Sequence, residues 1–292
     1  MRTIGRDYVA AALPPRREDG HKGDFGKLLI VGGAVGYTGA PYLSARAAVH
    51  SGCGLVFLGV PQCIWAAEAA KCVCAMPFPL PDDGARLSAE AAAPIRERLR
   101  GCDVLALGPG LGRSAGVSAL VHDLLWETEQ SVVLDADGLN ALAEDMSALE
   151  ARRGRTTILT PHDGELARLL GVSLDALARL DRVETTRRFA VRYGCTLVRK
   201  GHRTLIATPD GDVLENRCGG SALAKGGSGD VLTGVIAALL AQGATAEHAA
   251  CCGVWLHAQA GDLLTQELSA YCVTPEDLVH RGLPLAFRAL VP

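Results

Sequence analysis

The chain is organised around the stretch Gly219–Gly243, GGSALAKGGSGDVLTGVIAALLAQG. Its first half is too rich in glycine and small residues to form the interior of a helix. Its second half, Val231–Ala241, is apolar on most faces and predicts a buried helix. Between the two halves, Gly226-Gly227-Ser228-Gly229-Asp230 brings backbone N–H groups and a carboxylate to the N-terminus of that helix.

Free N–H groups at a helix N-terminus form an anion site, because the helix dipole places partial positive charge there. Phosphate suits such a site best. A lone Gly-x-Gly-Asp turn is more often a simple cap, with the aspartate as N-cap. The glycines of Gly219–Gly229 exceed what a cap needs and let a ligand approach the backbone closely. We therefore predict a phosphate-binding turn.

The chain has 292 residues, enough for two domains, but α/β folds of this size often form one. It is 49% hydrophobic with 34 glycines, which is typical of an alanine-rich layered protein with a large core. We expect a single domain over residues 1–292, with residues 1–20 as a helical N-terminal arm.

The net charge of −3 gives no basic surface for nucleic acid or acidic lipid. The N-terminus lacks the apolar core of a signal peptide, and no apolar run approaches the roughly 20 residues that span a bilayer. We therefore expect a cytoplasmic protein with no nucleic-acid or membrane partner.

Ten cysteines raise the question of a metal site or disulfides. The close pairs are Cys72-x-Cys74 and Cys251-Cys252, and neither has the two-residue gap common in zinc and redox motifs. Most of the others, such as Cys53 and Cys195, lie in apolar surroundings, where cysteine behaves as a small hydrophobe. We interpret the cysteines as structural thiols.

From Lys27 onward, buried strands, glycine turns and helices alternate. Such alternation predicts a mainly parallel central sheet with helices on both faces, an α/β fold. Strands are expected at 27–31, 55–60, 104–107, 131–134, 157–159 and 196–198, a hairpin at 204–207 and 213–215, and helices at 38–51, 117–126, 174–193, 231–241, 247–267 and 275–287.

Ligands of such sheets bind outside the carboxyl ends of the strands. Each unusual cluster of the sequence follows an expected strand, so we predict that these clusters converge on one composite site. The clusters are Gly32-Gly33, Gly108–Gly112, Asp135–Asn140, His162–Glu165 and Lys200–Thr204.

The glycine cluster Gly108–Gly112 is by itself a tight turn. Gly108, Gly110 and Gly112 alternate strictly, so the spacing of a dinucleotide fingerprint is absent, and no P-loop lysine follows. Asp135 and Asp137 are suited either to capping the next helix or to holding magnesium through water beside phosphates.

The remaining polar clusters leave alternatives open. Glu165 is favoured in a first helical turn by the helix dipole whatever its role. His162 is a cap or a ligand contact with even odds, and Lys200–Thr204 is a solvated loop or a nucleotide contact. His257, in an apolar helix, is more typical of a satisfied interior histidine than of a ligand.

Together these motifs resemble the ADP/ATP-dependent NAD(P)H-hydrate dehydratases of the ribokinase-like superfamily, over roughly residues 20–287. Each motif is weak alone, but their combination and order are specific. The motifs are Gly32-Gly33, Thr38-Gly39-Ala40-Pro41, Gly108–Gly112, Asp135–Asn140, Thr160-Pro161-His162-x-Gly164-Glu165, Lys200-Gly201 and Gly226–Gly234.

The resemblance implies a ribokinase-like three-layer fold and a repair reaction. Such enzymes phosphorylate the C6 hydroxyl of the hydrated nicotinamide ring of the S-epimer of NADHX or NADPHX from ADP or ATP, then eliminate phosphate to restore NAD(P)H. It implies that Asp230 is the base. It also implies that the N–H groups of Gly227, Ser228 and Gly229 hold the transferred phosphoryl group.

The resemblance also assigns the binding residues. Ala40, Gly110, Gly112, His162 and Asp230 would contact the hydrated substrate. The adenine nucleotide would contact Lys200, Gly201, His202, Arg203, Thr204 and Gly229, and Mg²⁺ would be ordered indirectly by Asp137, Asn140 and Glu165.

The epimerase domain fused in some relatives is not seen, so we expect a stand-alone dehydratase, a homotetramer by resemblance, that works with a separate epimerase. The donor is left open between ADP and ATP, and the resemblance suggests ADP for a bacterial protein. The substrate is left open between NADHX and NADPHX, because no single clamp for a ribose 2′-phosphate stands out.

The main alternative is a kinase for a small vitamin precursor in the same superfamily. Such kinases resemble the chain at the Gly-x-Gly-Asp turn but usually have asparagine where this chain has His162, so the histidine favours the dehydratase. A non-enzymatic nucleotide sensor is the third interpretation, and retention of Asp230 argues against it. The chain departs from the family at Glu68-Ala69-Ala70-Lys71, where many relatives have a Pro-Glu pair at the rim of the substrate pocket.

Overall fold

A ten-stranded sheet runs through the whole molecule in the order β1-β10-β9-β8-β7-β6-β5-β2-β3-β4. All neighbours pair in parallel except β9, which is antiparallel to both β8 and β10. The computed structural model describes residues 1–290, so 291–292 of the expected domain lie outside the described residues. The strands are β1 (Arg2–Ile4), β2 (Lys27–Val31), β3 (Leu55–Pro61), β4 (Met76–Leu80), β5 (Val104–Leu107), β6 (Ser131–Leu134), β7 (Thr157–Leu159), β8 (Thr196–Arg199), β9 (Leu205–Ala207) and β10 (Val213–Asn216).

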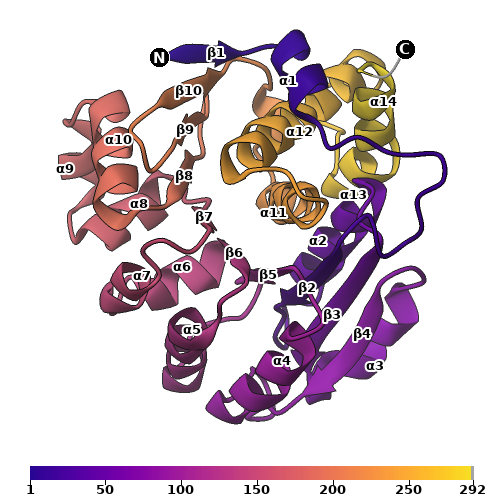
Figure 1. Ribbon diagram of the computed structural model, residues 1–292, viewed down its shortest axis with the longest axis vertical. Helices are drawn as coiled ribbons and strands as arrows, with labels where there is room; N and C mark the ends of the chain where they lie inside the picture. The colour runs from indigo at the N-terminus through magenta and orange to yellow at the C-terminus, as the bar shows by residue number, and fades with distance from the viewer. Residues whose placement is uncertain (291–292) are drawn as a thin grey trace.

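Helices cover both faces of this sheet (Figure 1), as predicted. The helices are α1 (Arg6–Ala12), α2 (Gly39–His50), α3 (Gln62–Lys71), α4 (Ala92–Leu99), α5 (Ala115–Glu127), α6 (Ala136–Leu142), α7 (Ser147–Ala151), α8 (Asp163–Leu170), α9 (Leu174–Ala178), α10 (Arg182–Tyr193), α11 (Ser228–Ala241), α12 (Ala246–Leu268), α13 (Pro275–Asp277) and α14 (Leu283–Arg288), with short turns at Ala89–Ala91, Ser221–Leu223 and Leu278–Gly282.

The alternation of side chains along β2 explains the two layers. Leu28 and Ile30 point into the cluster formed with α2, α11 and α12, whereas Leu29 and Val31 point into the cluster with α4 and α5. Successive residues of a strand face opposite sides, so a strand whose residues are all apolar must be covered on both. The expected mainly parallel, three-layer α/β fold is confirmed.

Helix α11 is the element on which the inner layer is built. Twelve of its residues are buried, and its main contacts are with α2 and α12, which lie beside it in Figure 1. Gly234 allows the approach of α2, because a Cβ there would lie 2.1 Å from the carbonyl oxygen of Ser44. The Ser44 hydroxyl also donates to the carbonyl oxygen of Asp230 (2.9 Å), which fixes the first turn of α11.

The sheet reverses its order of connection between β2 and β5, which are neighbours although two strands separate them in the sequence. Clefts for ligands open at such switch points. Here the two glycine turns meet, since the Gly33 N–H donates to the carbonyl oxygen of Pro109 (2.9 Å). The switch point therefore carries two of the clusters that were expected to converge.

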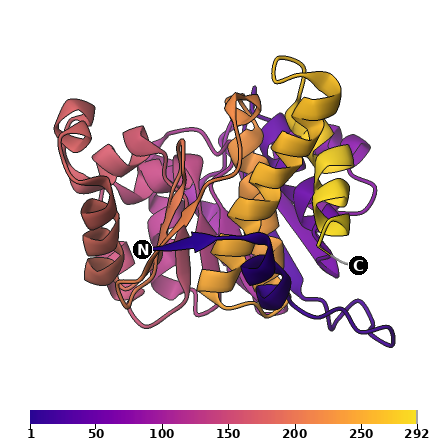
Figure 2. The same ribbon diagram turned by 90° about the horizontal axis from the view of Figure 1, so that it is seen from above.

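The N-terminal arm differs from the expected helical arm. It contains α1, but it also adds β1 as a strand parallel to β10 at the sheet edge, which lies beside α12 in Figure 2. Ile4 is buried, and the Tyr8 hydroxyl donates to Glu247 Oε1 (2.9 Å). The strand has three residues, Arg2–Ile4, and only Ile4 is apolar, which is too short a signal for a strand.

Several elements between residues 62 and 99 were not predicted, namely α3, β4 and α4. The sequence of β4, MPFPL, holds two prolines, which is compatible only with an edge strand, and β4 indeed ends the sheet. The helix expected at 174–193 is two helices, α9 and α10, and the one expected at 275–287 is interrupted by a π-helical turn at Leu278–Gly282.

The cysteines are all free, and Cys53, Cys102, Cys195, Cys251 and Cys252 are buried, as structural thiols should be. Burial raises the pKa of the Cys53 thiol to about 12, so it stays protonated. That interpretation does not extend to three exposed cysteines, which are Cys63, Cys74 and Cys272. In residues 1–290, no helix is both long enough and apolar enough to cross a bilayer.

Replacing Gly234 by alanine is expected to destabilise the fold by about 1–3 kcal/mol, because the new methyl group would overlap the Ser44 carbonyl oxygen and force α2 and α11 apart. Urea unfolding measures this. Gly116→Ala in α5 is the matched control, since its nearest contact lies at 3.7 Å, and it should leave stability unchanged or raise it by up to about 1 kcal/mol. Equal midpoints for the two variants would contradict the close-packing argument.

Candidate active site

The first turn of α11 leaves most of its backbone N–H groups free. Its N-cap is Gly227, with a left-handed φ of 96°, and no side chain caps the helix. Asp230 occupies the third position of the helix, so the simple alternative in which it is the N-cap is excluded. Four N–H groups at a helix start lack partners within the helix. Here the Ser228 N–H donates to the carbonyl oxygen of Lys225 (3.2 Å), whereas those of Gly227, Gly229 and Asp230 remain available to an anion.

The carboxyl group of Asp230 is half-buried and has no hydrogen-bond partner among residues 1–290. Burial raises its pKa, and the negative charges of Asp135, Asp137 and Glu165 raise it further, while Lys200 opposes them; the resulting pKa is about 7. A carboxyl group with a pKa near 7 is suited to accept a proton at neutral pH. Perturbed groups of this kind cluster at functional sites.

Lys200 leaves the end of β8 and joins two neighbouring elements. Its Nζ lies 2.7 Å from Asp135 Oδ1 and 3.8 Å from Glu165 Oε2. The Thr233 hydroxyl, one turn into α11, donates to the other oxygen of Asp135 (2.7 Å). Burial disfavours the charge of Lys200, but the two carboxylates outweigh it and raise its pKa, so it remains a cation.

This network brings Lys200 to the anion turn. A Cβ built on Gly229 would lie 3.5 Å from Lys200 Nζ and 3.8 Å from Asp135 Oδ2. The free N–H groups of α11 and a lysine ammonium group therefore border the same space. Such an arrangement is suited to a phosphate that is being transferred.

His162 is a helix cap. Its ring Nδ1 accepts from the backbone N–H groups of Gly164 (3.0 Å) and Glu165 (3.2 Å). The backbone N–H of His162 donates in return to Glu165 Oε2 (2.8 Å), which completes a capping box. Burial, with Lys200 and Arg168, lowers the pKa of the imidazole. Because Nδ1 accepts, Nε2 carries the proton of the neutral ring. His162 also borders a cavity of about 740 Å³ beside Lys200. The cap alternative is thus confirmed, and the ring is still accessible to a ligand.

The carboxylate of Asp137 links the glycine turn Gly108–Gly112 to Asn140 in α6. Its Oδ2 accepts from the Gly112 N–H (2.9 Å) and its Oδ1 from Asn140 Nδ2 (3.1 Å). Asn140 Oδ1 in turn accepts from Arg168 Nε (2.8 Å). Gly110 lies against α2, since a Cβ there would lie 3.0 Å from the Cβ of Ala40. The structure therefore places Ala40 beside Gly110 and Gly112 beside Asp137.

The described residues form no cluster of side chains that would ligate a metal ion directly. Within the described part of the chain, no group of three or more His, Cys, Asp or Glu side chains is placed to hold a metal ion. Asp137, Asn140 and Glu165, which were predicted to order Mg²⁺ indirectly, instead form the hydrogen bonds described above. That these three residues order Mg²⁺ through water stays a prediction.

A cavity of about 740 Å³ opens beside Lys200, Ser228 and Gly229. It is lined by Gly201, His202 and Thr204 but not by Arg203, although all four were predicted nucleotide contacts. The guanidinium group of Arg182 donates to the carbonyl oxygens of His202 (3.0 Å) and Arg203 (2.9 Å). These bonds fix the backbone of the loop, and the Arg203 side chain stays outside the cavity lining.

His257 also lines this cavity and was predicted only as an interior histidine. That interpretation is confirmed, since the ring is buried and its Nε2 lies 3.1 Å from the Ser228 hydroxyl. Burial lowers its pKa to about 4, so the ring is neutral. Its place in the cavity could have been predicted only from the packing of α12 on α11.

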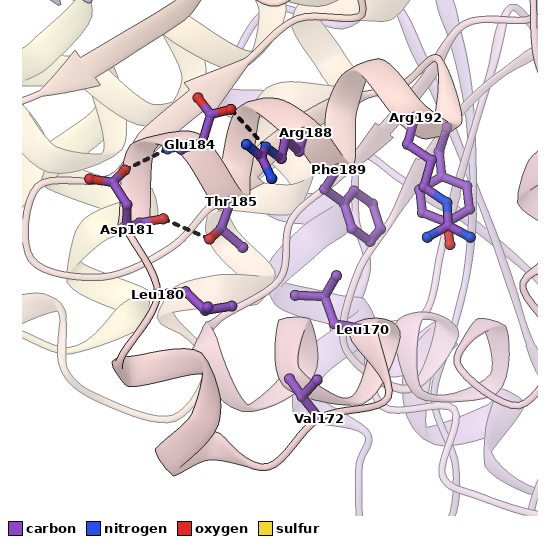
Figure 3. A pocket seen from close by; sticks show the side chains of 10 residues that line it. Leu170, Val172, Leu180, Asp181, Glu184, Thr185, Arg188, Phe189 and Arg192 are labelled. Carbon is purple, nitrogen blue, oxygen red and sulfur yellow. Dashed lines mark hydrogen bonds and ion pairs between the residues drawn. The ribbon is translucent and has the colours of Figure 1, made fainter.

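A separate, mostly apolar hollow of about 390 Å³ lies between α8, α9 and α10 (Figure 3). Leu170, Val172, Leu180 and Phe189 form its floor, and the charged groups at its rim are engaged with neighbours in the same helix, as in the pair of Glu184 with Arg188. None of the predicted site residues lines it. His162, Lys200, Gly201, His202, Thr204, Ser228 and Gly229 line instead the cavity beside Lys200.

Comparison with known proteins identifies the family. The model of the NAD(P)H-hydrate dehydratase family matches residues 28–282. The chain belongs to this family. It is 41% identical to the ADP-dependent (S)-NAD(P)H-hydrate dehydratase of Neisseria meningitidis serogroup B, over 86% of this chain and 81% of that protein. The resemblance seen in the motifs is confirmed.

Two further relatives extend the comparison. A bifunctional NAD(P)H-hydrate repair enzyme of Moorella thermoacetica is 42% identical over 99% of this chain, and the chain spans about half (54%) of its length. The crystal structure of the ADP/ATP-dependent NAD(P)H-hydrate dehydratase of Bacillus subtilis, co-crystallised with ATP/Mg²⁺, superposes with a TM-score of 0.81 at 30% identity, covering 99% of this chain and 98% of that one. Membership of this family favours the dehydratase interpretation of the sequence over the vitamin-precursor kinase.

Replacing Lys200 by methionine is expected to raise the pKa of Asp230 above its value of about 7, because the lysine charge lowers it and the neighbouring carboxylates would then act unopposed. Titration of the Asp230 carboxyl carbon by NMR measures this shift. Lys22→Met, which removes a lysine from the exposed N-terminal arm, is the control and should leave the pKa unchanged. A lower or unaltered pKa in the Lys200 variant would show that the lysine does not act on Asp230.

Proposed function

We propose that the protein restores NAD(P)H from the S-epimer of its hydrate, using ADP or ATP to phosphorylate the C6 hydroxyl and then eliminating phosphate. The observation that carries this proposal is the position of Asp230, a half-buried carboxyl group with a pKa of about 7. It lies at the start of a helix that has no side-chain cap and whose Gly227 and Gly229 N–H groups are free. Family membership supports the same reaction.

In the first step, Asp230 takes the proton of the C6 hydroxyl as its oxygen attacks the terminal phosphorus of the nucleotide. The bond between that phosphorus and the leaving nucleotide breaks. The N–H groups of Gly227 and Gly229, with Lys200 Nζ beside them, stabilise the charge on the phosphoryl oxygens, whereas the Ser228 N–H already donates to the carbonyl oxygen of Lys225 (3.2 Å). Because these donors are fixed before the reaction, they need no reorganisation during it.

In the second step, the ring nitrogen lone pair expels phosphate from C6, and loss of a proton from the adjacent ring carbon restores the double bond. Phosphorylation is needed because hydroxide is a poor leaving group and phosphate a good one. Overall, the hydrate loses one water, whose oxygen leaves in the phosphate.

The substrates are assigned to two sides of Asp230. The adenine nucleotide occupies the 740 Å³ cavity along Lys200–Thr204 and Gly229. The hydrated nicotinamide lies toward the switch point, against Ala40, Gly110 and Gly112, with His162 between the two. Arg203 contributes its backbone through Arg182 rather than a side chain in the cavity.

Magnesium fits this site as an indirectly held ion. Asp137 keeps lone pairs beyond its two hydrogen bonds, and it lies near enough to Asp230 to raise the pKa of that group. Asp137, Asn140 and Glu165 would hold it through water. When bound, Mg²⁺ neutralises charge on the nucleotide phosphates.

We further propose that residues 1–292 act as one domain, in the cytoplasm, as a homotetramer alongside a separate epimerase. The single continuous sheet supports the single domain, and the other three proposals follow the motif resemblance to the family. ADP is the favoured donor, since the Neisseria relative is named as ADP-dependent, although the Bacillus subtilis relative is named for both nucleotides.

The test is to incubate the purified protein with the S-hydrate of NADH or NADPH and either ADP or ATP, and to follow the near-ultraviolet absorbance of reduced nicotinamide. Regeneration that requires the nucleotide is expected, at roughly 1–10³ turnovers per second. Phosphorylation of a vitamin precursor without any regeneration would replace the dehydratase with the kinase alternative.

Asp230→Asn is expected to lower kcat by about 10²–10⁴-fold, because it removes the proton acceptor. Nucleotide binding should persist, since the N–H groups and Lys200 remain, and calorimetric titration with ADP checks this. The acid limb of the wild-type rate profile, where activity falls as pH drops through about 7 and Asp230 is protonated, should disappear in the variant. A wild-type rate would remove Asp230 as the base.

A further inference from the structure

The 740 Å³ cavity has an apolar part next to its phosphate-binding part. Cys218, Leu223, Val254 and Ala258 line it. Gly219 packs directly on Leu223 and Ala258, since a Cβ there would lie 3.1 Å from each. Flat apolar walls of this kind suit the faces of an aromatic base better than a ribose or a phosphate, which need polar partners.

The polar side chain of Asn216 lies beside this apolar part. Asn216 ends β10, which runs parallel to β8, so it lies at the same edge of the sheet as Lys200. It is only 2% exposed and lines the cavity. Sequence reasoning missed it because the expected hairpin strand ended one residue earlier, although the rule for strand ends applies to it.

The amide of Asn216 is held in one orientation. Its Nδ2 donates to the carbonyl oxygen of Cys218 (2.9 Å), and a flipped amide would place two oxygens against each other. Its backbone N–H donates to the carbonyl oxygen of Thr204 (2.9 Å). The bond from Nδ2 orients the side chain and the backbone bond fixes its Cα, but neither uses the acceptor Oδ1.

Asn216 Oδ1 is buried and has no hydrogen-bond partner among residues 1–290. Buried acceptors in native proteins are nearly always paired, because an unpaired one forfeits its hydration. A side chain held rigidly with an unused acceptor in a ligand cavity therefore indicates that the ligand supplies the donor.

We propose that Asn216 Oδ1 accepts a hydrogen bond from the exocyclic amino group of the adenine base and so determines the base specificity of the nucleotide site. The inference rests on the proposed function, in which this cavity holds ADP or ATP. A base with oxygen at the same ring position presents an acceptor to an acceptor. Sites built around a hydrogen bond reject ligands that lack its partner.

The experiment compares ADP with inosine diphosphate (IDP), in which an oxygen replaces the amino group. Calorimetric titration of the wild-type protein is expected to give about 10–100-fold tighter binding of ADP, the range for leaving a buried acceptor unpaired. Asn216→Leu removes the acceptor at similar volume and should bring the two affinities within about threefold. Where the leucine does not fold, Asn216→Ala removes the same acceptor without added bulk.

Asn216→Asp is the matched control. It keeps an oxygen acceptor toward the base, although its second oxygen then faces the Cys218 carbonyl oxygen, so both nucleotides should bind more weakly while the preference for ADP persists. A merely structural role for Asn216 would instead weaken both nucleotides equally in every variant. Retention of the full ADP preference in Asn216→Leu or Asn216→Ala would overturn the proposal.

Failure of this inference is distinct from failure of the proposed function. Equal binding of ADP and IDP by wild-type protein that still regenerates NAD(P)H removes the role of Asn216 alone. Absence of binding of both nucleotides removes the nucleotide site itself, and the inference with it.

Discussion

The ion pair between Lys200 and Asp135 is the interaction on which the site depends. It joins the ends of β8 and β6, and through Thr233 it reaches α11, so three elements distant in sequence are locked together. It also places a positive charge among the carboxylates of Asp135, Glu165 and Asp230. Removing one partner of such a buried pair typically costs about 3–5 kcal/mol, because the other charge stays buried without compensation.

The same arrangement raises the pKa of Asp230, which fits its proposed role as a proton acceptor. Burial and three neighbouring carboxylates push its pKa up, and Lys200 limits the rise. In the proposed mechanism, the lysine therefore acts both on the nucleotide phosphates and on Asp230. Both effects need a close fit at the strand ends, and Gly108 provides part of it, because a Cβ there would lie 1.8 Å from the carbonyl oxygen of Asp135.

The sequence was sufficient for the layout of the fold and for the convergence of the motifs. Asp135 and Lys200 are 65 residues apart, yet both follow buried parallel strands, and a rule about strand ends was enough to bring them together. Membership of the family then followed from the order of the motifs.

Other features depend on side-chain packing that no local pattern records. The carboxylate that pairs with Lys200 could not be chosen from Asp135 and Glu165 by sequence, since both follow neighbouring strands. The double role of His162, a cap that also borders the cavity, required the geometry of α8. The edge strand β4 was missed because prolines usually argue against a strand.

The order of the chemistry can be tested through one oxygen atom. The protein, a nucleotide and a hydrate carrying ¹⁸O in its C6 hydroxyl are allowed to react, and the released phosphate and the water are analysed by mass spectrometry. Transfer of the phosphoryl group to the hydroxyl before elimination predicts ¹⁸O in inorganic phosphate. Appearance of ¹⁸O in water, with unlabelled phosphate, would contradict it and leave the anion turn beside Asp230 without its proposed role.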